Sequence, residues 1–96
     1  MKKFQAIITF TITEEFMQLV PPHRTYIGYL INKNIVDCYL VSMESQTIWI
    51  TFNAVAKEEI EKYLRKSPLY KFWTYIIEEL FLYDGQLYRL PTVQLN

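Results

Sequence analysis

Apolar and polar residues alternate along four stretches of the chain, and this alternation predicts β-strands. All four stretches are rich in β-branched and aromatic residues, which favour strands. They cover residues 3–12, 35–43, 47–53 and 73–83. A fifth apolar stretch, residues 86–96, follows the turn signal Asp84-Gly85 and is expected to lie on a surface of the folded domain.

Two other stretches repeat apolar residues at the spacing of an amphipathic helix. The first begins at Pro22 and ends at the polar residues 32–34, with Asn34 expected in a left-handed conformation. The second covers residues 56–66. The buried stripe of the first helix is expected to comprise Tyr26, Ile27, Leu30 and Ile31, with His23, Arg24 and Lys33 outside it.

A short helical turn is expected before the first helix. Thr13 has a side chain suited to an N-cap, and Glu14 and Glu15 follow it in the first turn, where carboxylates favour the helix dipole. Pro21 and Pro22 are expected to stop this turn, because proline lacks the backbone N–H of a helix interior. Two separate helical segments are therefore predicted here.

The resulting order β-α-β-β-α-β predicts a ferredoxin-like α+β fold. In this fold two helices cover one face of a four-stranded antiparallel sheet, and 96 residues form a single domain, 1–96. We expect Ile7, Tyr39, Val41 and Trp49 to share the other face, which is then apolar. Two such faces packed together would make a dimeric α/β barrel.

The composition also favours an oligomer. Aromatic residues make up 17% of the chain, more surface than one small core is expected to cover. The formal net charge is zero with no basic patch, so neither nucleic-acid binding nor membrane binding is expected. The single cysteine, Cys38, excludes an internal disulfide and a cysteine-based metal cluster and is expected to be an inert thiol. No apolar run could span a membrane and no signal peptide is evident, so a cytoplasmic protein is predicted.

Several short motifs resemble one known family. They are Pro22-His23-Arg24, Leu30-Ile31-Asn32-Lys33-Asn34-Ile35, Trp49, Ser67-Pro68-Leu69 and the closing Leu90-Pro91-Thr92-Val93-Gln94-Leu95-Asn96. Together these motifs resemble the muconolactone isomerase-like proteins, and the closing motif resembles the ending of bacterial members. The resemblance implies a ferredoxin-like dimeric barrel. It also implies a cofactor-independent isomerase that moves a double bond in a small lactone by proton transfer.

His23 and Arg24 are the first candidates for such chemistry. A histidine is the side chain whose unperturbed pKa lies near neutrality, so His23 could transfer a proton. Arg24 could hold a carboxylate in a bidentate fork. In the alternative interpretation His23 is an exposed residue of the first helical turn, and Arg24 pairs with Glu14 or Glu15.

A carboxylate is the third candidate catalytic group. Glu78 and Glu79 point to opposite faces of the last strand, and one of them, Glu79, is taken as an inward-facing base. The alternative is a carboxylate at the edge of the sheet, where it prevents strand pairing.

Three aromatic residues are candidates for ligand binding. Tyr39, Trp49 and Tyr75 could line a pocket on the open face of the sheet, or they could belong to the core or to a dimer interface. No phosphate-binding loop and no metal-ligand cluster is present, so no cofactor and no metal are expected.

Two classes of function follow from these candidates. The first is the cofactor-independent isomerase, with His23, Arg24 and Glu79 around a cavity. The second is a non-catalytic homodimeric barrel that binds a small apolar ligand or serves as a structural or interaction module.

Overall fold

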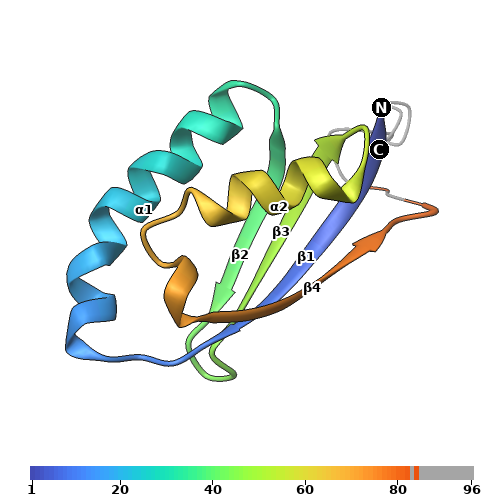
Figure 1. Cartoon of the computed structure of the whole chain (residues 1–96). Coiled ribbons are helices and arrows are strands. Elements are labelled where there is room, and N and C mark those ends of the chain that lie inside the picture. The colour runs from blue at the N-terminus through green and yellow to red at the C-terminus, as the bar shows by residue number, and fades with distance from the viewer. Residues whose placement is uncertain (83, 85–96) are drawn as a thin grey trace, which may run out of the picture.

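The structure, a computed structural model, describes residues 1–82 and 84. These residues form four strands and two α-helices in the order β-α-β-β-α-β, which confirms the ferredoxin-like α+β fold (Figure 1). The elements are β1 (Lys2–Phe10), α1 (Glu14–Asn32), β2 (Val36–Ser42), β3 (Thr47–Ala54), α2 (Lys57–Arg65), the short 3₁₀ helix η1 (Tyr70–Phe72) and β4 (Trp73–Glu79). Strand β4 ends earlier than predicted, and the C-terminal stretch 86–96 lies outside the described residues.

The sheet is antiparallel throughout and has the strand order β2-β3-β1-β4. One face forms the core, where alternate residues of β1 and β3 pack against both helices. The core residues on these elements are Phe4, Ala6, Ile8 and Phe10 from β1, Ile48, Ile50, Phe52 and Ala54 from β3, and Phe16, Ile27, Leu30, Ile60 and Leu64 from the helices. In Figure 1, α1 lies beside β2 and α2 lies across the sheet.

Helix α1 is one continuous helix, which corrects the prediction of two segments. Thr13 does cap it, because its hydroxyl accepts a hydrogen bond of 3.0 Å from the backbone N–H of Phe16. Pro21 and Pro22 lie inside the helix and do not stop it. Both are exposed, as are the residues one turn before them, so water can reach the carbonyls that lose their helical partners.

The continuous helix also changes its buried stripe. Phe16, His23, Ile27 and Leu30 are buried, at spacings of seven, four and three residues. His23 therefore lies on the buried stripe, which corrects the prediction that it lies outside it. Ile31, expected on the stripe, is exposed. Asn34 takes the predicted left-handed conformation after the helix, with φ 63°.

Strand β2 contains a bulge between Val36 and Cys38. One extra residue is inserted there, so every later side chain of β2 changes face relative to a regular strand. Tyr39 is consequently paired with Ile50, and Val41 is paired with Ile48, on the face covered by the helices. This corrects the expectation that Tyr39 and Val41 lie on the open face.

The open face nevertheless carries an apolar row. Leu40 is paired with Trp49, Trp49 with Ile7, and Ile7 with Ile76, so the row crosses all four strands. Leu40 and Ile76 are each 55% exposed. The rows on either side contain mainly hydroxyl and other polar residues.

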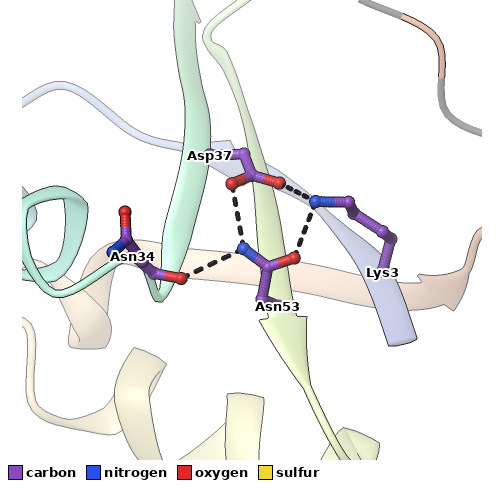
Figure 2. A network of polar contacts seen from close by, with 4 residues as sticks. All are labelled: Lys3, Asn34, Asp37 and Asn53. Atoms are coloured by element: carbon purple, nitrogen blue, oxygen red, sulfur yellow. Dashed lines mark hydrogen bonds and ion pairs between the residues drawn. The ribbon is translucent and has the colours of Figure 1, made fainter. Parts of the chain in front are cut away.

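A polar network fixes the bulge (Figure 2). Asn53 lies at its centre: its side-chain amide donates to Asp37 Oδ1 (2.9 Å) and to the carbonyl of Asn34 (3.0 Å), and its oxygen accepts from Lys3 Nζ (2.7 Å). Lys3 also forms an ion pair with Asp37. The network thus connects β1, β2, β3 and the turn after α1, and its half-buried groups depend on one another.

We predict that Asn53→Ala lowers the free energy of unfolding by about 1–3 kcal/mol, because three partners lose a hydrogen bond at once. Chemical denaturation measures this change. Asn32→Ala, at an exposed position at the end of α1, is the matched control and should not lower stability. Equal effects of the two substitutions would contradict the role given to the network.

Candidate functional site

A cavity of about 200 Å³ lies between α1 and the helix-covered face of the sheet. Most of its lining is apolar and comes from β1, α1, β2, β3 and the segments that follow β2 and α2. The apolar lining residues are Phe10, Phe16, Met17, Val20, Val41, Met43, Ile48 and Leu69. Three polar residues complete it, namely His23, Arg24 and Tyr39. Of the predicted site residues, these three are brought together.

His23 forms the buried polar wall of the cavity and is only 1% exposed. Its Nδ1 lies 2.8 Å from Ser67 Oγ, and its Nε2 lies 2.8 Å from the Tyr39 hydroxyl. The rings of His23 and Trp73 pack edge to face, with their centroids 5.5 Å apart. His23 is thus neither an exposed first-turn residue nor a freely moving proton carrier.

Burial, with a smaller contribution from the nearby Arg24 charge, lowers the pKa of His23 to about 4. The imidazole is therefore neutral at pH 7, with one nitrogen as donor and the other as acceptor. Burial also raises the pKa of Tyr39 to about 12, against a smaller lowering by Arg24. The Tyr39 hydroxyl consequently keeps its proton.

Arg24 lies beside this pair, and its side chain lines the cavity from an exposed position on α1. Within residues 1–82 and 84, it has no hydrogen-bond or ion-pair partner. The alternative pairing with Glu14 or Glu15 is not observed: Glu15 pairs with Lys71 at 2.6 Å. A guanidinium thus stands at the cavity without a carboxylate from the described part of the chain.

The predicted carboxylate is not part of this site. Glu79 is exposed and forms an ion pair with Lys2 at 3.7 Å. It lies six residues after Trp73 along β4, about 20 Å from the end of the strand that contacts His23. Glu78 is also exposed, opposite Gln5 on the open face. By register Glu79 lies opposite Phe4 on the helix-covered face, but its side chain is exposed, so neither carboxylate is an enclosed base.

The three aromatic candidates are separated by the sheet. Trp49 lies on the open face with Leu40 and Ile7, whereas Tyr39 and Tyr75 lie on the helix-covered face. Tyr75 is paired with Ile8, and its hydroxyl donates to Glu61 of α2. Only Tyr39 of the three lines the cavity.

Ser67 is a site residue that the sequence analysis missed. It is 5% exposed, and its hydroxyl accepts a hydrogen bond of 3.0 Å from the backbone N–H of Leu69 while contacting His23. In the sequence, Ser67 stands directly after the second predicted helix and belongs to the motif Ser67-Pro68-Leu69, with no site role assigned to it. Nothing in the local sequence links Ser67 to His23, which lies 44 positions earlier.

The described residues contain neither a metal-binding cluster nor a membrane-spanning helix. No group of three or more His, Cys, Asp or Glu residues there could hold a metal ion. No helix in that part of the chain is long and apolar enough to cross a membrane. Cys38 is half-buried on the open face, opposite Thr51.

Comparison with known proteins does not assign the chain to a family: neither a protein-family model nor a curated protein sequence matches it. The geometry of the cavity is therefore the feature that indicates a function.

The low pKa of His23 predicts how stability depends on pH. In the unfolded chain the imidazole has a pKa near 6.5, and in the folded chain near 4, so the unfolded state binds the proton first as the pH falls. The contribution of His23 to the free energy of unfolding is then constant above about pH 7 and decreases below it, by on the order of 3 kcal/mol by pH 4. Denaturant titrations at a series of pH values measure this decrease.

His23→Gln is the control, because His23 is the only histidine of the chain. The variant should lose the dependence between pH 6.5 and 5, where the carboxylates remain largely ionised. An NMR titration gives a second readout. Protonation of the native imidazole with a pKa near 6.5 would refute the arrangement described for His23.

Proposed function

We propose that this protein binds a small, largely apolar molecule in the cavity between α1 and the sheet. One observation carries the proposal: an apolar cavity has its few polar groups, His23, Arg24 and Tyr39, gathered on one side. Apolar walls with a small number of convergent polar groups are typical of ligand sites, where the polar groups fix orientation. The cavity lies within one chain, so binding does not require a partner subunit.

The volume of the cavity limits the ligand. At about 200 Å³ it is somewhat larger than an apolar cavity of about 150 Å³ that accepts benzene. It is smaller than the pockets of roughly 300–1,000 Å³ that hold drug-sized molecules. A single ring with a short substituent is the appropriate size.

The entrance also supports exchange of a ligand with solvent. Met17, Val41 and Met43 line the cavity and are 48%, 45% and 53% exposed. Methionine side chains are unbranched and adapt to different shapes. An entrance of this kind can admit an apolar molecule without a large movement of the backbone.

The isomerase activity implied by the family resemblance stays a prediction. It requires one group to remove a proton and a second to return it. Both nitrogens of His23 are already hydrogen-bonded, and Glu79 belongs to a distant part of β4. These positions favour binding as the function of the cavity.

Filling the cavity tests the proposal. Val20→Phe places a ring in the space that the ligand would occupy, so it should weaken binding of benzamide, a phenyl ring with a small polar head, by at least about tenfold. Titrations followed by two-dimensional NMR measure the affinity. Val55→Phe is the matched control, because Val55 is 67% exposed and does not line the cavity. If benzamide shifts no cavity resonance in the unmodified protein, the proposal fails.

We also propose that the chain forms a homodimer through the open face of the sheet. The support is the apolar row Leu40, Trp49, Ile7 and Ile76, which crosses the whole sheet with polar rows beside it. A second copy is a suitable occupant, since two faces of this kind are self-complementary and the chain has no net charge to oppose association.

Ile76→Lys should weaken the dimer by at least about 100-fold, because each copy would bury an unpaired ammonium group in the apolar row. Sedimentation equilibrium over a wide concentration range measures the change against the 11.6 kDa of one chain. Val55→Lys alters an exposed residue outside the row and should leave the dimer intact. A native protein that remains monomeric at high concentration would exclude this assembly.

A further inference from the structure

We infer that the ligand of the cavity is an apolar carboxylic acid, whose carboxylate is held by Arg24 and the Tyr39 hydroxyl while its apolar body fills the cavity. This inference rests on the binding function proposed above and names the chemical class of the ligand. It follows from the charge and the hydrogen-bond direction of the groups at the polar side.

Arg24 supplies the charge. Its guanidinium is close enough to act on both neighbours: it adds to the lowering of the His23 pKa, and it opposes the larger effect of burial, which raises the pKa of Tyr39. Residues that line the cavity include no aspartate or glutamate, and among residues 1–82 and 84 Arg24 has no ion-pair partner. A planar guanidinium is suited to a carboxylate, which it can bind with two parallel hydrogen bonds.

Hydrogen-bond direction at His23 follows from Ser67. The Ser67 oxygen already accepts from the backbone N–H of Leu69, and the residue is buried. If His23 Nδ1 also donated to it, the Ser67 proton would have no acceptor in the described part of the chain, and such buried unpaired groups are disfavoured. The favourable arrangement has Ser67 donating to Nδ1 of the neutral ring.

The same arrangement makes Tyr39 a free donor. His23 Nε2 then carries the ring proton and donates to the Tyr39 oxygen at 2.8 Å. The phenol proton of Tyr39 remains, and over the described residues it has no other hydrogen-bond acceptor. Arg24 and Tyr39 therefore both present donors to the cavity, which matches a group that only accepts, such as an ionised carboxylate.

A singly charged head group fits better than a doubly charged one. His23 is neutral at pH 7, so Arg24 is the single cation among the residues that line the cavity. One guanidinium balances a carboxylate, whereas a phosphate would leave charge uncompensated beside apolar walls.

A matched pair of probes tests the inference at pH 7. Benzoate and benzamide have nearly the same shape, and they differ in charge and in the presence of N–H donors on benzamide. We expect benzoate to bind at least about tenfold more tightly in titrations followed by two-dimensional NMR. Arg24→Gln should reduce benzoate to the affinity of benzamide, and Arg24→Lys should give an intermediate affinity.

Two further variants separate the contributions. Arg65→Gln is the control, because Arg65 is an exposed arginine of α2 outside the cavity and its removal should preserve the preference for benzoate. Tyr39→Phe should reduce the preference by several-fold while Arg24 maintains part of it. Thermal melting of each variant verifies that it is folded.

The outcomes distinguish this inference from the binding function beneath it. Equal affinities for benzoate and benzamide, unaffected by Arg24→Gln, would overturn the acid as the ligand class while the cavity remains a binding site. Binding of neither probe would overturn the binding function itself. A preference for benzoate that disappears with Arg24→Gln and persists with Arg65→Gln would establish the inference.

Discussion

The buried imidazole of His23 is the interaction on which the cavity side of the molecule depends. Its two nitrogens connect α1 to Tyr39 of β2 and to Ser67, which follows α2. An imidazole that is 1% exposed is costly unless both nitrogens are hydrogen-bonded and the ring is neutral. The hydroxyls of Tyr39 and Ser67 bond both nitrogens, and the low pKa keeps the ring neutral at pH 7. These bonds hold α1, β2 and the segment after α2 together beside the cavity.

The bulge in β2 is what makes this interaction possible. In a regular strand Tyr39 would point to the open face, and Nε2 of His23 would have no hydroxyl partner there. The extra residue turns Tyr39 towards α1, and the network around Asn53 holds the extra residue in place. A polar cluster near one end of β2 thereby determines which side chain completes the site further along the strand.

The sequence predicts the fold well because each strand and helix carries its own periodic signal. It predicts the site only in part, because the signals that decide the site are not local. The bulge depends on the pairing of β2 with β3, so Tyr39 was assigned to the wrong face. The continuous helix depends on exposure of Pro21 and Pro22, so the stripe that buries His23 was not recognised. With Phe16 placed on the same helix, its spacing to His23 would have indicated burial.

The position of His23 also favours one of the two classes of function. A general base works best with a pKa near the working pH and with a lone pair directed at the substrate. Here the pKa is near 4, and both ring nitrogens are already hydrogen-bonded, Nδ1 to Ser67 and Nε2 to the Tyr39 hydroxyl. The role of His23 at the cavity is thus to orient the Tyr39 hydroxyl as a donor, next to the guanidinium of Arg24. These groups are suited to fixing the position of an anion and not to accepting its proton, so the arrangement favours recognition over proton transfer.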